Sequence, residues 1–98
     1  MTSRTTAGIL DQIAAVRQEL KDRYSVIRIG IFGSAARGEI RPDSDVDILI
    51  KLVEPTFDHY MDLKFRLEDI LNRPVDLVME ETVKPRLKQI IAKEVLYA

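Results

Sequence analysis

Two short motifs constrain this chain more than any other feature: Gly33–Gly38, with the sequence GSAARG, and Ser44–Asp47, with the sequence SDVD. The first motif ends an apolar run with small residues and offers backbone N–H groups, a hydroxyl and a guanidinium, which suit phosphate. The second begins an apolar run with two carboxylates two residues apart, so both point to one face of a strand. Oxygen ligands beside a phosphate site suit magnesium that is shared with a nucleotide. These residues therefore predict metal-dependent chemistry on a nucleoside triphosphate.

The composition restricts the class of protein further. The chain has 98 residues, which predicts a single domain, residues 1–98, with little chain left for a large substrate pocket. Its net charge of -1 lacks the basic excess of nucleic-acid-binding proteins, so direct nucleic-acid binding is not expected. The sequence has no cysteine, which excludes disulfides and thiolate chemistry, and its single histidine, His59, excludes a histidine-rich zinc site.

The ends and the apolar runs of the sequence indicate where the protein is located. No apolar run reaches membrane-spanning length, and residues 1–6 lack the apolar core of a signal peptide. A cytoplasmic location without membrane association is therefore expected. Residues 1–6 are polar and are expected to be disordered.

Apolar residues recur at helical spacing in three segments, which predict helices over about residues 5–24, 56–71 and 85–96. Thr5 or Thr6 can cap the first helix, Thr56 or Asp58 the second, and Pro85 fits the first turn of the third. A single helical turn is expected over residues 34–39. The side chains predicted to face inward are Ile9, Ile13, Val16, Leu20 and Tyr24 in the first helix, Tyr60, Leu63, Leu67, Ile70 and Leu71 in the second, and Leu87, Ile90, Ile91 and Val95 in the third.

Three apolar segments between these helices predict strands over residues 26–32, 45–52 and 75–79. In the first strand, alternation places Ile27, Ile29 and Ile31 on one face. In the second, the face lined by Val46, Ile48, Ile50 and Leu52 is expected to be buried, opposite Asp45 and Asp47. In the third, Asp76 points away from the face that carries Val75, Leu77 and Met79.

The order of these elements is α-β-α-β-α-β-α, which predicts an α/β (α+β) fold. Its sheet is small and mixed, with three strands, or four if one more short strand joins, and is flanked by helices. A helix of crossover length joins the second and third strands, so a parallel pair is expected. All three carboxylates then lie at one end of the sheet. The Gly33 turn reaches that end only if the first strand runs antiparallel to the second.

The motifs resemble the signature of the DNA polymerase β-like nucleotidyltransferase superfamily, in which ten residues separate Gly-Ser from Asp-x-Asp. Here the pattern comprises Gly33-Ser34 and Asp45-Val46-Asp47, with Asp76 on a later strand. The sequences GSAARG and SDVD resemble more narrowly the minimal nucleotidyltransferases of prokaryotes, which are short single-domain proteins. The resemblance covers most of the chain, and it implies the polymerase β-like nucleotidyltransferase fold.

The resemblance also implies a reaction and the residues that perform it. Asp45, Asp47 and Asp76 would be catalytic and would hold two magnesium ions, which bridge the triphosphate of ATP. Gly33 and Ser34 would bind the β- and γ-phosphates. Their neighbour Arg37 lies one turn further on, where its guanidinium can reach phosphate oxygens. A hydroxyl would attack the α-phosphorus and pyrophosphate would leave.

Minimal nucleotidyltransferases are often encoded beside a HEPN-domain protein, and the two form a toxin–antitoxin pair. The resemblance therefore implies an antitoxin that transfers AMP from ATP to a tyrosine of a HEPN-type ribonuclease toxin. One alternative is an antitoxin that neutralises its partner by binding alone. Another is one subunit of a two-component enzyme that nucleotidylates a small molecule such as an aminoglycoside. A homo-oligomer or a hetero-oligomer is compatible with each of these functions.

Each of these residues also has a plainer interpretation. Asp45 and Asp47 could be solvated residues at the start of a strand, although aspartate is disfavoured inside strands. Asp76 could face water on an edge strand, and Arg37 could be an ordinary exposed arginine. Several other polar residues are expected to be structural: Asp43 and Ser44 in a turn, Arg28 in an ion pair with a surface carboxylate, and Lys84, Arg86, Lys88 and Lys93 on a solvated helix face that could instead meet an acidic partner or RNA.

Overall fold

The computed structural model describes residues 5–41 and 43–98. The predicted disorder of residues 1–4 falls outside this range. Thr5 and Thr6 do not fit the prediction of disorder, because Thr5 caps the first helix and Thr6 begins it. The elements are the helices α1 (Thr6–Ala15), α2 (Arg17–Tyr24), α3 (Gly33–Ala36), α4 (Phe57–Leu71) and α5 (Pro85–Glu94), the 3-10 turn η1 (Glu80–Thr82), and the strands β1 (Val26–Phe32), β2 (Val46–Leu52), β3 (Val75–Met79) and β4 (Leu96–Tyr97).

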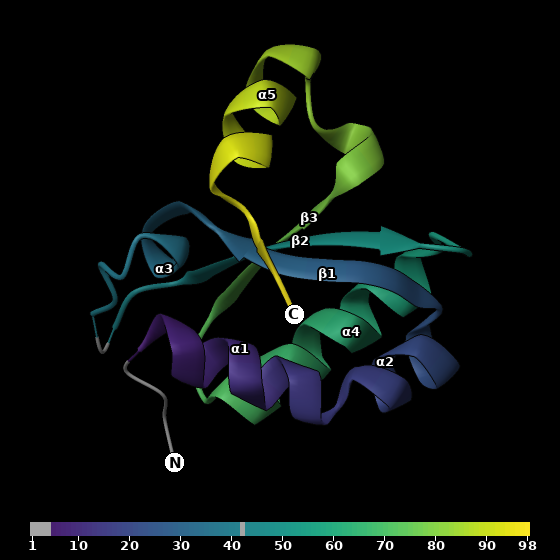
Figure 1. Ribbon diagram of the computed structural model, residues 1–98. Coiled ribbons are helices and arrows are strands. Elements are labelled where there is room, and N and C mark those ends of the chain that lie inside the picture. Colours follow the sequence, from purple (N-terminus) through teal and green to yellow (C-terminus); the bar gives the residue numbers. More distant parts are fainter. Residues whose placement is uncertain (1–4, 42) are drawn as a thin grey trace.

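The strands form one mixed sheet in the order β3-β2-β1-β4 (Figure 1). β2 runs parallel to β3, and β1 runs antiparallel to both β2 and β4. These pairings confirm the directions that were predicted for the first three strands. The fourth strand, which the sequence left open, is the two-residue β4 at the edge of the sheet. The end of β1 and the starts of β2 and β3 therefore lie at the same end of the sheet.

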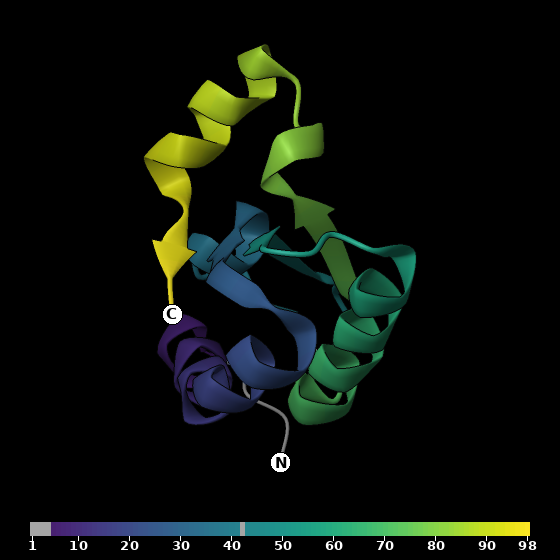
Figure 2. The same cartoon turned by 90° about the vertical axis from the view of Figure 1, so that its right-hand side faces the viewer.

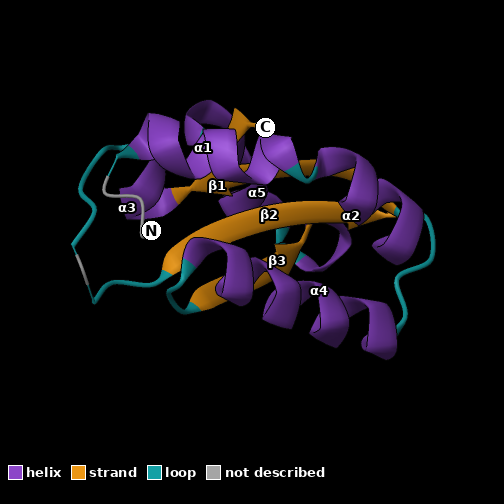
Figure 3. Cartoon of the chain, turned by 90° about the horizontal axis from the view of Figure 1, so that it is seen from below, coloured by secondary structure: helices purple, strands orange, loops and turns teal. Residues whose placement is uncertain are grey.

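Helices cover the two faces of the sheet unequally. α1, α2 and α4 lie together across one face (Figure 3), whereas α5 rises from the opposite face and extends away from the sheet (Figures 1 and 2). The core lies between the sheet and the first group of helices. Its fully buried members include Ile9 and Ile13 from α1, Leu20 from α2, Leu63 and Leu67 from α4, and Ile31, Ile48 and Ile50 from the strands. The face of β2 that was predicted to be buried is buried.

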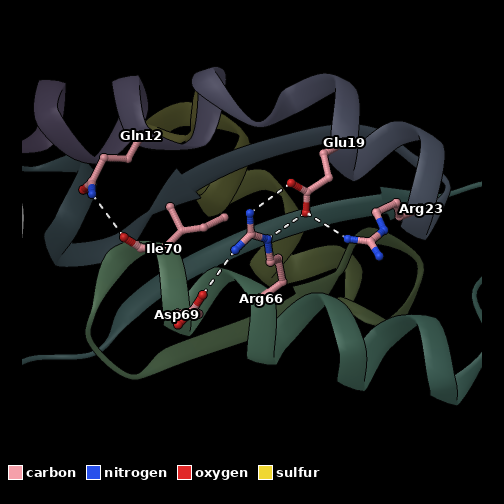
Figure 4. A network of polar contacts seen from close by, with 6 residues as sticks. All are labelled: Gln12, Glu19, Arg23, Arg66, Asp69 and Ile70. Atoms are coloured by element: carbon pink, nitrogen blue, oxygen red, sulfur yellow. Dashed lines mark hydrogen bonds and ion pairs between the residues drawn. The ribbon is translucent and has the colours of Figure 1, made fainter.

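On the face of the sheet that α1, α2 and α4 cover, polar contacts join α1 and α2 to α4 (Figure 4). Arg66 of α4 donates two hydrogen bonds to the Glu19 carboxylate of α2, at 2.7 and 2.9 Å. Gln12 of α1 donates from Nε2 to the Ile70 carbonyl at 3.1 Å. Solvent screens the ion pair, so its net contribution to stability is small. The two-pronged geometry sets how α2 lies along α4.

Two local predictions were wrong. The single helix expected over residues 5–24 is broken at Val16, whose backbone leaves the helical region (φ -112°, ψ 11°) and whose N–H donates to the Ile13 and Ala14 carbonyls. Ile27 is 53% exposed, although alternation was expected to place it on one face of β1 with Ile29 and Ile31, which are buried. The pairing with β2 shifts between Val26 and Arg28, and this bulge turns Ile27 away from the core.

The last helix also differs from its prediction. It ends at Glu94, because the chain then enters β4. All ten residues of α5 are described, and each is at least partly exposed; Leu87 is 51% exposed and Ile90 is 56% exposed. The apolar stripe of α5 is therefore not a core face in this chain. In the described part of the chain, no helix is both long enough and apolar enough to cross a membrane.

Leu67→Ala tests whether the layer beneath the sheet is the stabilising core. Leu67 is fully buried, so its truncation should lower the free energy of unfolding by about 2–5 kcal/mol, through lost burial and the cavity that remains. The matched control is Phe65→Ala on the same helix, where the side chain is 57% exposed; it should change stability by only about 0.5 kcal/mol. Urea denaturation measures both, and similar losses would contradict this assignment of the core.

Candidate active site

The sheet register places Asp47 at the centre of the site. Asp47 lies on β2 opposite Phe32 of β1 and opposite Asp76 of β3. Phe32 is the last residue of β1, so the turn at Gly33 begins beside Asp47. Asp45 immediately precedes β2 and is exposed, as is Asp76. The structure thus brings residues of three strands together where the sequence predicted one site.

The turn that begins at Gly33 has a backbone conformation that favours glycine. Gly33 has a φ of +67°, and a Cβ atom added there would collide with the Oδ2 atom of Asp47. The rest of the turn is the short helix α3. It is anchored by Ala35, which is 2% exposed and whose carbonyl accepts a hydrogen bond from Thr6 Oγ1 at 2.6 Å. Gly33 therefore allows the carboxylate of Asp47 to lie against the backbone of the turn.

The acids of this region act on one another through their charges. Burial of Asp47 raises its pKa, and the neighbouring carboxylates of Asp76 and Asp45 raise it further, with a smaller contribution from Glu94. A carboxyl group in this position binds a proton or a cation more readily than an exposed one, because either relieves the repulsion. The electrostatics of the site are those of a cation-binding region.

Glu94, the last residue of α5, belongs to this region and was missed from the sequence. Its Oε1 atom accepts a hydrogen bond from the Gly33 N–H at 2.9 Å, and its Oε2 atom accepts one from Arg37 Nη1 at 3.1 Å. Arg37 also contacts Glu39, with 3.4 Å between Nε and Oε2. Nothing in the local pattern around Glu94 marks it, because it reaches the site only through the pairing of β4 with β1.

The donor set suits magnesium, although the protein does not form a complete cage. Among residues 5–41 and 43–98, no three acidic or histidine side chains are grouped closely enough to hold a metal ion. The ligand set predicted from Asp45, Asp47 and Asp76 is therefore not assembled as a protein-only cage. Magnesium in nucleotide sites is usually held by one or two carboxylates together with substrate phosphates. The adjacent carboxyls of Asp47 and Asp76 fit that mode of binding.

The structural roles predicted for other polar residues agree with their contacts. Arg28 donates to both oxygens of Glu80, at 2.8 and 2.7 Å, and lies over the Tyr97 ring. The hydroxyl of Ser44 closes a turn by bonding to the Arg41 backbone. The basic residues of the last helix and its start are all exposed, namely Lys84, Arg86, Lys88 and Lys93.

A surface hollow of about 1020 Å³ lies elsewhere, against α2 and the start of β1. It is lined by Arg17, Lys21, Ile27 and His59 among others, and it includes none of the predicted site residues. Its mixed lining lacks the convergent acids and the glycine turn of the other end of the sheet. The predicted site residues lie together at the Asp47 end of the sheet and not at this hollow.

Comparisons with known proteins agree with this geometry. The family model for the nucleotidyltransferase domain matches residues 13–98. The chain is 39% identical over 98 residues to protein adenylyltransferase MntA of Thermococcus cleftensis, and the match covers 99% of each chain. This chain belongs to the nucleotidyltransferase domain family.

Solved structures share the fold. One, of a protein assigned as a minimal nucleotidyltransferase, is 36% identical and superposes with a TM-score of 0.73, covering 89% of this chain and 93% of its own. Another is a chain from the complex of the tri-AMPylated Shewanella oneidensis HEPN toxin with its MNT antitoxin. It is 18% identical and has a TM-score of 0.67, covering 95% of this chain and 71% of its own.

Two glycine substitutions test the close approach of Asp47 to the turn. Gly33→Ala and Gly38→Ala both place alanine at a positive φ, which costs about 1–2 kcal/mol of stability. At Gly38 the new Cβ would lie 3.9 Å from Thr6 Oγ1, an ordinary contact, whereas at Gly33 it would collide with Asp47. Gly33→Ala should therefore lower the free energy of unfolding more than Gly38→Ala. Equal losses in urea denaturation would mean that the Asp47 carboxylate moves aside without cost and that its contact with the turn does not contribute to stability.

The raised pKa of Asp47 predicts how stability depends on pH. A carboxyl whose pKa is higher in the folded than in the unfolded chain destabilises the fold once pH exceeds the folded pKa. Asp47→Asn should therefore raise the free energy of unfolding at pH 7, and the gain should vanish below the ordinary aspartate pKa of about 3.9. The exposed Asp11→Asn serves as the control and should give no such pH-dependent gain. A less stable Asp47→Asn protein at pH 7 would refute the prediction.

Proposed function

We propose that this chain is a protein adenylyltransferase that moves AMP from ATP to a hydroxyl of a partner protein. The observation that carries the proposal is the position of Asp47, which lies beside the Gly33 turn on one side and opposite Asp76 on the other. A triphosphate at the turn would then have its reacting end close to the acids. Membership of the nucleotidyltransferase family and the similarity to protein adenylyltransferase MntA support this reaction.

In this proposal each group of the site has a defined role. The Gly33 N–H, the Ser34 hydroxyl and the Arg37 guanidinium bind phosphate oxygens of ATP. Asp47 and Asp76, with Asp45 beside them, would hold magnesium, which would stabilise the charge that develops on the attacking and leaving oxygens. The acceptor oxygen forms a bond to the α-phosphorus, the bond to the pyrophosphate oxygen breaks, and Asp76 accepts the proton of the hydroxyl. The protein contributes mainly position and charge.

We propose that the acceptor is a tyrosine of a HEPN-type ribonuclease toxin and that the chain acts as its antitoxin. The structure that pairs a tri-AMPylated HEPN toxin with an MNT antitoxin supports this partner, because it shares the fold of this chain. The small size of the chain also supports it, since a chain of 98 residues that builds a nucleotide site has little surface left to enclose an acceptor. The acceptor protein would then supply its own binding surface.

Transfer of label from ATP tests the proposed reaction. The protein is incubated with magnesium, ATP labelled in the α-phosphate, and the HEPN-type protein encoded beside it. The partner should become labelled, and Asp45→Asn with Asp47→Asn should lower the rate by about a hundredfold or more, because a bound metal supplies several kcal/mol of charge stabilisation. Chelation of magnesium should have the same effect. Asp11→Asn, which changes a carboxylate of α1, should transfer label at the normal rate.

The result also separates the enzyme from the two alternatives. If the double variant neutralises the toxin without transferring label, the chain is a binding antitoxin and the catalytic proposal is wrong. If label appears only on a small molecule such as an aminoglycoside, the acceptor assignment is wrong while the nucleotidyl transfer stands. A toxin that is labelled and inactivated by the wild-type protein alone satisfies the proposal in full.

A further inference from the structure

The carboxylate of Glu94 lies where the proposed function would place phosphate oxygens. Its two oxygens accept hydrogen bonds from the Gly33 N–H at 2.9 Å and from Arg37 Nη1 at 3.1 Å. Both donors are groups that the sequence analysis assigned to phosphate. A carboxylate that bridges an amide and a guanidinium presents two negative oxygens, as a phosphate does. These donor positions cannot serve Glu94 and a phosphate at the same time.

The pairing of β4 with β1 brings the end of α5, and with it Glu94, beside the Gly33 turn. β4 pairs antiparallel with β1, with Leu96 opposite Ile31. Continuing this register by two residues toward the end of β1 places Glu94 opposite Gly33. The contact is therefore set by strand pairing and is not a chance meeting of two surface side chains. The side chain of Glu94 is 26% exposed and that of Arg37 is 50% exposed, so a ligand can approach both from solvent.

The helix that carries Glu94, α5, has no fully buried side chain. Its residues are all at least partly exposed, and its apolar side chains Leu87 and Ile90 are more than half exposed. Figure 2 shows that α5 stands away from the helices that cover the other face of the sheet. A rotation of the partly exposed Glu94 side chain away from the turn would leave β4 in place and would expose little apolar surface.

Charge also opposes the presence of Glu94 and a triphosphate together. The Glu94 carboxylate already places negative charge at the Gly33 turn, against which Asp47 also lies. A triphosphate brings several more negative charges to the same end of the sheet. Because like charges at close range repel strongly in a partly buried site, Glu94 is expected to leave when the nucleotide enters.

We propose that Glu94 is an internal competitor of the nucleotide, which holds the Gly33 N–H and Arg37 in the empty protein and is displaced by the triphosphate. This inference rests on the proposed function, because it assumes that phosphate binds at the Gly33 turn. Its consequence is an affinity for nucleotide lower than that of the turn alone. The apparent Kd equals the intrinsic Kd divided by the fraction of molecules in which Glu94 has left the turn.

Calorimetric titration with magnesium and a non-hydrolysable ATP analogue tests the inference. Glu94→Ala should bind the analogue about 5- to 20-fold more tightly than the wild type, because no competitor has to leave. Glu94→Gln keeps the shape of the side chain and loses its charge, so its gain should be smaller. The matched control is Glu39→Ala, which removes the other carboxylate on Arg37; it should change affinity less than about twofold, since that contact is exposed.

A kinetic measurement separates competition from a merely structural role. In the transfer of AMP, Glu94→Ala should lower the KM for ATP and leave kcat nearly unchanged, since only the empty protein is altered. Thermal melts show whether each variant is folded before it is titrated. A Glu94→Ala protein that is folded and binds nucleotide no more tightly than the wild type overturns the inference.

The remaining outcomes distinguish this inference from the function on which it rests. Equal gains from Glu94→Ala and Glu39→Ala would mean that net charge alone sets the affinity, and would overturn the role of Glu94. Binding by the wild type without any gain in Glu94→Ala refutes the competitor and leaves the proposed function intact. A wild type and variants that all fail to bind the analogue overturn both.

Discussion

The pairing of β2 with β1 on one side and β3 on the other is the constraint on which the rest of the structure depends. It places Asp47 opposite the end of β1 and opposite Asp76 at once. The register is fixed by burial, since Val46, Ile48 and Ile50 fill the core face and a shift of one residue would turn them to solvent and Asp47 into the core. Apolar packing on one face of the sheet thus positions the charges on the other.

This arrangement brings several carboxylates close together, and their mutual repulsion opposes folding. Asp47 lies among other carboxylates, and its raised pKa reflects their repulsion together with partial burial. Glu94 would add to that repulsion, but its charge is met by Arg37 and by the Gly33 N–H. The same donors are those that a phosphate would need. In this structure an internal carboxylate therefore satisfies groups that the proposed reaction would use for its substrate.

Much of the fold follows from short-range patterns. The bounds of β1 and β3 match their predicted ranges, β2 begins one residue later than predicted, and α4 begins after its Thr56 cap. The exceptions have local causes that periodicity does not record. A bulge turns Ile27 outward, a break at Val16 divides the first helix, and the apolar stripe of α5 leaves Leu87 and Ile90 exposed. The roles of Asp45, Asp47 and Asp76 remain predictions, since they came from resemblance to a family.

The sequence by itself determined the first three strands, the buried faces of β2 and α4, and the motifs that point to nucleotide chemistry. Each of these depends on residues close together in the chain, where spacing and side-chain type are sufficient. Only the tertiary structure decided that Glu94 meets Gly33 and Arg37, and that a fourth strand delivers it there. Contacts between residues 61 positions apart depend on strand pairing, and a two-residue strand leaves no periodic pattern by which it could be recognised.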